Sequence, residues 1–151
     1  LAQVNVVANI VTYDWNTFRK KLANGEHDSV LIGWLADNSD PDNFYRPLLS
    51  CAAAESGSNR ANWCNEEYDS YIFQGLATPD PKLRKNFYHT AENILFDQMP
   101  LVPIAHAIRY QVTRNNLKGV KLNPFGGINF DGAIKVSENT TANNRINKEQ
   151  N

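Results

Sequence analysis

The residues best suited to chemistry lie in one short segment, Gly33 to Phe44, which carries carboxylates at Asp37, Asp40 and Asp42. The segment follows the apolar run Val30 to Leu35, which predicts a buried strand. Ligands of open α/β sheets bind beyond the carboxyl ends of strands. An aspartate beside a tryptophan can accept charge-assisted hydrogen bonds from an ammonium group, while the indole offers a stacking surface. A ligand anchor is therefore one interpretation.

Other interpretations of these acids stay open on the residues alone. The segment can be a solvated turn whose aspartates cap backbone groups, and we assign Asp40 and Asp42 to that role. Asp37, Ser39 and Asp42 also alternate like calcium ligands, although the glycine and the later glutamate of an EF-hand are missing. The alternative function is a metal- or carboxylate-dependent hydrolase that uses Asp37, Asp40 and Asp42. It lacks a second metal-ligand cluster and a nucleophile motif, so we expect a protein that is not an enzyme.

The elements that position this segment are expected to form an α/β fold. The run Val30 to Leu35 predicts a strand that is buried on both faces. Asp14 predicts a helix start, and Asn24-Gly25 predicts its end. A short helix or an irregular segment is expected from Phe44 to Ser50.

Two further helices are expected before Pro100, and extended chain after it. One runs from Glu66 to Leu76, with Tyr68, Ile72 and Leu76 on one face. The next starts at Asp80-Pro81 and has an apolar stripe formed by Leu83, Phe87, Ala91, Ile94 and Leu95. Trp15, Phe18, Phe87 and Phe96 are expected in the core. Leu101 to Val112, Val120 to Leu122 and Phe130 to Val136 are expected to be extended, and a polar tail covers 137–151.

The two cysteines, Cys51 and Cys64, flank a segment of small and polar residues. They are either unrelated buried thiols or a disulfide that closes a loop, and we favour the disulfide. A metal site needs more ligands, and no histidine lies near them in the sequence. A disulfide implies an oxidising compartment.

Composition excludes several classes of partner. The net charge is −1, with 42% hydrophobic and 21% charged residues. Binding of nucleic acid or of an anionic membrane surface needs a clustered basic excess, so neither is expected. No apolar run approaches the ~20 residues of a membrane span, and membrane insertion is not expected. The three histidines show no metal-ligand spacing, so no metal or cofactor is expected.

The acidic segment and the rest of the chain together resemble a known family. The resemblance is to the extracellular solute-binding proteins of the dipeptide/oligopeptide ABC-transporter class (family 5), with the Sap-type antimicrobial-peptide-resistance proteins most similar. It is carried by Gly33-Trp34-x-Ala36-Asp37, Asp40 to Phe44, the cysteine pair with Gly57 to Asn59, Arg84-x-x-x-Tyr88-x-x-Ala91-Glu92-x-Ile94-Leu95, Gln98-x-Pro100-x-x-Pro103, Leu117 to Val120, Asn123 to Gly126 and Phe130-x-Gly132.

The resemblance implies a ligand-binding segment. In the family, the acid that matches Asp37 binds the α-amino group of a peptide, and the tryptophan that matches Trp34 walls the pocket. We include Leu35 and Ala36, which lie between them, among the expected ligand-binding residues. Some oligopeptide binders have an arginine near the peptide carboxylate where this chain has Leu31. The resemblance also implies haem as an alternative ligand.

The resemblance further implies the C-terminal part of a two-lobed periplasmic binding protein of type II. Residues 1–100 are expected to form most of one lobe, 101–136 to return through the hinge into the other, and 137–151 to form the tail. The expected function is capture of peptides, antimicrobial peptides included, and their delivery to an inner-membrane ABC permease for transmembrane transport. We expect a periplasmic monomer whose signal peptide lies in an N-terminal part that the sequence lacks.

Overall fold

The computed structural model describes residues 1–137, which form two compact units. The first comprises Leu1–Trp34 and Asp40–Val102, and the described part of the second comprises Leu35–Ser39 and residues 103–137. The predicted tail, 137–151, lies outside the described residues except for Ser137.

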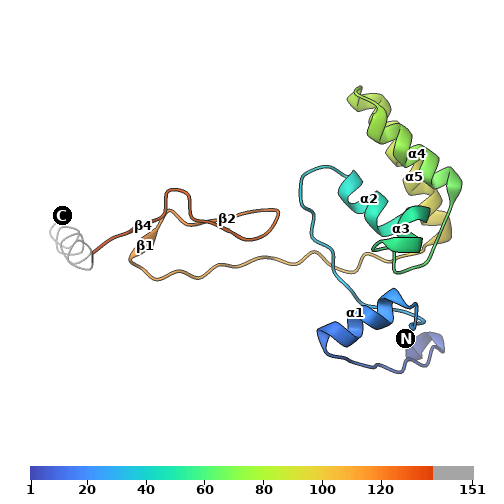
Figure 1. Ribbon diagram of the computed structural model, residues 1–151, viewed down its shortest axis with the longest axis horizontal. Coiled ribbons are helices and arrows are strands. Elements are labelled where there is room, and N and C mark those ends of the chain that lie inside the picture. Colours follow the sequence, from blue (N-terminus) through green and yellow to red (C-terminus); the bar gives the residue numbers. More distant parts are fainter. Residues whose placement is uncertain (138–151) are drawn as a thin grey trace. The chain divides into compact units, whose positions relative to one another are not determined.

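Helices dominate the first unit (Figure 1). Its elements, in chain order, are the 3-10 turn η1 (Ala2–Val4), α1 (Trp15–Ala23), α2 (Asp42–Leu49), α3 (Cys51–Ser56), α4 (Glu66–Ala77) and α5 (Pro81–Gln98). The predicted starts of α1 and α5 are confirmed, because the Asp14 and Asp80 carboxylates accept backbone N–H groups of the first helical turns. The helix expected from Phe44 to Ser50 is α2, and the loop between the cysteines contains an unpredicted helix, α3.

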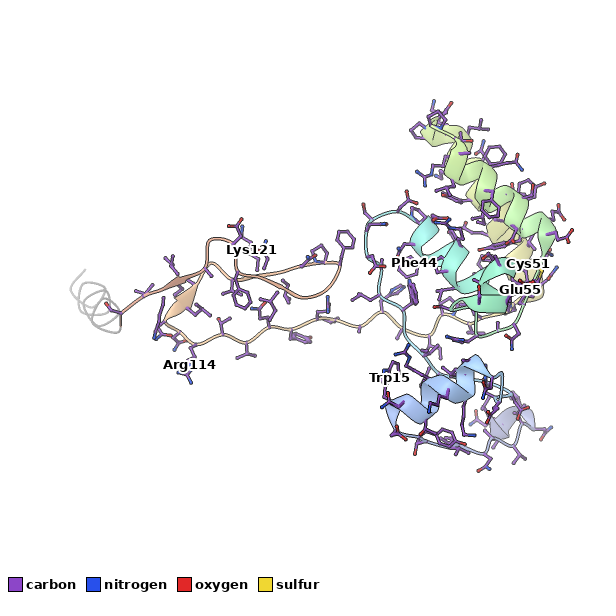
Figure 2. All side chains as sticks on the ribbon, in the orientation of Figure 1. Trp15, Phe44, Cys51, Glu55, Arg114 and Lys121 are labelled. Carbon is purple, nitrogen blue, oxygen red and sulfur yellow. A yellow bond between two sulfur atoms is a disulfide. The ribbon has the colours of Figure 1, made fainter. Side chains whose placement is uncertain are left out.

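The core of the first unit lies where α4 and α5 pack together, with α2 contacting α4. Its buried apolar residues are Leu49, Tyr68, Ile72, Tyr88 and Ala91. The stripe predicted for α5 is wrong at its N-terminal end, because Leu83 is exposed and Tyr88 is buried instead. Two of the aromatic residues expected in the core are also exposed, namely Trp15, labelled in Figure 2, and Phe96.

The predicted buried strand from Val30 to Leu35 is wrong for the chain as described. The segment has no regular secondary structure, and Leu31 is 80% exposed. An apolar run becomes a buried strand only where neighbouring strands accept and donate its backbone hydrogen bonds. The strands of the described residues pair only with one another, so none of them does so here.

The second unit contains two nested antiparallel ladders. Strand β1 (Leu117–Lys118) pairs with β4 (Ile134–Lys135), and β2 (Lys121–Leu122) pairs with β3 (Ile128–Asn129). Gly119 lies between the ladders at φ 78°, and a Cβ there would lie 2.1 Å from the carbonyl oxygen of Gly132. A side chain at this position would therefore break the close approach of the two chain segments.

Candidate functional site

The first of the predicted ligand-binding residues, Trp34, is hydrogen-bonded to the start of α2. Its indole Nε1 donates a hydrogen bond of 2.8 Å to the backbone carbonyl oxygen of Asn43. Trp34 remains 37% exposed, so part of the indole stays uncovered. The arrangement fixes the ring while leaving surface that a ligand could contact.

Asp40, three residues after the predicted ligand-binding residue Asp37, is bound to helix α5. The Nη2 atom of Arg84 lies 2.7 Å from Oδ1 and 2.8 Å from Oδ2 of Asp40. Oδ1 also accepts the backbone N–H of Asp42 at 2.9 Å. The predicted capping role of Asp40 is thus confirmed, and the ion pair adds a second role. The hydrogen bond from Arg84 is the largest of the effects that hold the pKa of Asp40 below its ordinary value.

The other two acids of the segment lie in different surroundings. Asp42 is 7% exposed, and its Oδ2 forms an ion pair of 2.9 Å with Nη2 of Arg46. Asp37 is exposed, whereas Ala36 is half-buried. Within residues 1–137, no three His, Cys, Asp or Glu side chains gather in a way that could hold a metal ion. Because Asp40 and Asp42 are each paired with an arginine, nothing supports the calcium loop or the hydrolase.

Sequence reasoning missed the polar network behind Asp40. Nη2 of Arg84 also donates to the hydroxyl of Tyr88 at 2.8 Å, and the ring of Tyr88 lies 5.3 Å from that of Tyr45. The hydroxyl of Tyr45 donates to the Glu92 carboxylate. Burial is the main cause that raises the pKa of Tyr45 above its ordinary value, and the hydrogen bond with Glu92 is the next. The i, i+4 spacing of Arg84 and Tyr88 could have predicted their contact. The contacts of Arg84 with Asp40 and of Tyr45 with Glu92 span 44 and 47 residues, and no local pattern predicts them.

The predicted disulfide is confirmed. Cys51 and Cys64 are joined, with their Cα atoms 4.4 Å apart, and Figure 2 shows Cys51 on α3. The backbone N–H of Cys51 donates to the Asp69 carboxylate at 3.1 Å. Inside the loop, the Asn59 amide is 1% exposed and donates to the carbonyls of Ser50 (3.1 Å) and Trp63 (2.8 Å). The loop is thus bound at several points to the rest of the first unit (Leu1–Trp34 and Asp40–Val102), the helical unit.

The second unit has a shallow hollow of about 310 Å³. It is lined by Arg109, Tyr110, Gln111, Leu122, Gly127 and Ile128. None of the predicted ligand-binding residues lines it. Arg109 donates to the carbonyl of Asn123 at 3.4 Å, which uses one of its guanidinium nitrogens within the unit.

Among the described residues, no helix is long and apolar enough to cross a membrane. No family model matches the sequence. The chain is 41% identical over 130 residues to the dipeptide-binding protein of Escherichia coli, which is 86% of this chain and 24% of that protein. It is 42% identical over 135 residues to the peptide transport periplasmic protein SapA of Salmonella typhimurium, which is 89% of this chain and 25% of that protein.

A solved structure agrees with these relatives. It is a dipeptide-binding protein from Pseudoalteromonas in complex with Met-Leu, which matches with a TM-score of 0.80 and 48% identity over 89% of this chain and 26% of that one. This likeness confirms the expected fold class. The chain spans about a quarter of the length of the curated relatives it matches. Over most of its length, the chain is therefore homologous to one part of the dipeptide-binding and Sap-type periplasmic peptide-binding proteins.

Proposed function

We propose that the complete protein is the periplasmic substrate-binding component of a peptide ABC transporter. It captures peptides between two lobes and delivers them to an inner-membrane permease, and it is a monomer without enzyme activity. The observation that carries the proposal is the identity of about 40% over most of the chain to dipeptide-binding and SapA proteins. These relatives are transport proteins that bind substrates, not enzymes.

Within this function, residues 1–100 contribute most of one lobe and 101–136 return through the hinge to the other. Closing of the lobes around a peptide would shift the population toward the closed state, since the ligand contacts both. The boundary after Val102, between the helical unit and the hairpin unit (Leu35–Ser39 and residues 103–137), supports this assignment, although residues 35–39 belong to the hairpin unit. The strands of the hairpin unit pair with one another in two antiparallel ladders.

We infer that Asp37 binds the α-amino group of the ligand, with Trp34, Leu35 and Ala36 forming the adjoining wall. An exposed carboxylate can accept hydrogen bonds from an ammonium group, and such charge-assisted bonds are stronger than neutral ones. The uncovered part of the Trp34 indole, three residues before Asp37 in the sequence, offers an apolar and cation-attracting surface. The chemistry of the segment therefore suits the amino end of a peptide.

Calorimetry on the full-length protein with the dipeptide Met-Leu tests this function. Wild type is expected to bind Met-Leu and to bind N-acetyl-Met-Leu much more weakly, because acetylation removes the ammonium charge. Asp37→Asn should cost ~2–5 kcal/mol with Met-Leu, which is roughly 30-fold or more in affinity. It should cost little with the acetylated peptide. Asp97→Asn, on the exposed side of α5, is the matched control and should bind as wild type does.

Two results would count against the proposal. Equal affinity of wild type and Asp37→Asn for Met-Leu would exclude Asp37 as the amino-group anchor. Native mass spectrometry of the full-length protein purified from cells would show a retained peptide if the function is right. Retained haem in place of peptide would contradict peptide capture. Incubation with a mixed peptide pool should leave the peptides intact, since a binding protein does not shorten them.

A further inference from the structure

Both ends of the segment that carries Asp37 are held by the helical unit. At one end, the Trp34 indole donates to the carbonyl of Asn43. At the other, the Asp40 carboxylate binds Nη2 of Arg84 through both oxygens. Residues 35–39, which belong to the second unit, join these two points along the chain. A short segment with fixed ends has fewer conformations than one with a free end, so less entropy is lost when it binds a ligand.

Arg84 is itself held by the core of the helical unit. Its Nη2 lies 2.8 Å from the hydroxyl of Tyr88, and its Cζ lies 5.2 Å from the centre of the Tyr88 ring. Tyr88 is buried and belongs to the core cluster. A chain of direct contacts therefore leads from the core through Arg84 to Asp40. The same nitrogen, Nη2, makes the contacts with Asp40 and with the Tyr88 hydroxyl.

We infer that Arg84 is a positioning residue for ligand binding, which fixes Asp40 and thereby holds the segment with Asp37 in its binding conformation. The inference rests on the proposed function, and it assigns to Arg84 no contact with the ligand. The fixed ends of a short segment restrict its conformations, so loss of the contact between Arg84 and Asp40 should allow residues 35–39 more conformations. The affinity for a ligand that needs Asp37 should then fall.

The first test compares two substitutions that remove the same chemical group. Arg84→Met and Arg46→Met each delete a guanidinium that pairs with an aspartate, at Asp40 and at Asp42. Only the first removes a contact that holds the end of the segment. In the full-length protein, Arg84→Met should weaken Met-Leu binding by roughly fivefold or more, at the lower end of couplings within one hydrogen-bond network. Arg46→Met should change it by less than about twofold.

The second test separates positioning from general stability. With Asp37→Asn already present, Arg84→Met should cause little further loss of affinity, because the group that it positions is no longer charged. Arg84→Lys should bind better than Arg84→Met, because one ammonium group can supply the contacts that Nη2 makes. A loss of melting temperature without a loss of affinity would overturn the inference. So would an equal loss in Arg46→Met, or a lysine variant no better than the methionine variant.

Hydrogen exchange without ligand keeps this inference distinguishable from the proposed function. Arg84→Met should speed amide exchange in residues 35–39, and Arg46→Met should not. Unchanged exchange would overturn the role of Arg84 even if Met-Leu binds as proposed. If wild type does not bind Met-Leu, the proposed function fails. The exchange result then decides by itself whether Arg84 holds the segment.

Discussion

The ring of Tyr88 on α5 lies directly against the backbone of Gly75 on α4. A Cβ atom on Gly75 would lie 2.8 Å from Cε1 and 3.1 Å from Cδ1 of Tyr88. The two helices can approach this closely only because position 75 has no side chain. The contact also holds the tyrosine whose hydroxyl accepts a hydrogen bond from Arg84.

The first prediction is that Gly75→Ala lowers the free energy of unfolding by about 1–3 kcal/mol, the usual cost of overpacking a core. Alanine is the better helix former by about 1 kcal/mol, so a loss would show that the clash outweighs propensity. Urea unfolding of the full-length protein measures the change. Gly33→Ala is the control, because a Cβ there meets no atom within 4 Å. Equal stability of both variants would contradict the close packing.

The second prediction concerns Asn59, whose buried amide donates to two backbone carbonyls, those of Ser50 and Trp63. Asn59→Asp keeps the shape but replaces the donor with a carboxylate oxygen that faces those carbonyls. We expect the free energy of unfolding at pH 7 to fall by about 1–3 kcal/mol or more, since the buried acceptors lose their partner. Chemical unfolding measures it. Asn93→Asp, on the exposed side of α5, should change stability little; a similar loss there would contradict the specific role of Asn59.

The third prediction is a pH dependence from the Asp40–Arg84 pair. Because Arg84 lowers the pKa of Asp40, the pair stabilises the folded state above the ordinary carboxyl pKa of 3.8. This stabilisation is lost as the pH falls below 3.8 through the lowered pKa. Wild type should therefore be more stable than Asp40→Asn at pH 7, with a difference that shrinks toward pH 2. The difference should stay under about 1 kcal/mol, because both side chains are about a third exposed.

Melting curves of the full-length protein between pH 2 and pH 7 measure this difference. Arg84→Met supplies the control background, since Asp40 has lost that partner there. In this background the effect of Asp40→Asn should depend less on pH. The same pH dependence in both backgrounds would show that another group is responsible for it.

The sequence by itself determined the local features. Asp14, Asp80 and Pro81 predicted where two helices begin, because capping and the fixed φ of proline act within one turn. The short segment of small and polar residues between Cys51 and Cys64 predicted the disulfide that joins them. The motifs around Trp34 and Asp37 pointed to the peptide-binding proteins to which the chain is related. The role of Asp37 remains a prediction.

Only the tertiary structure decided which side chains meet. The apolar stripe predicted for α5 included the exposed Leu83, whereas the buried side chain is Tyr88, because burial on a helix depends on where its partner packs. The apolar run at 30–35 predicts a buried strand, yet it pairs with no strand among the described residues. Strand pairing needs neighbouring strands, which a local sequence pattern does not specify. The contact between Asp40 and Arg84 spans 44 residues of sequence. Periodicity and capping act over a few residues, so a contact of that span follows only from the packing of whole helices.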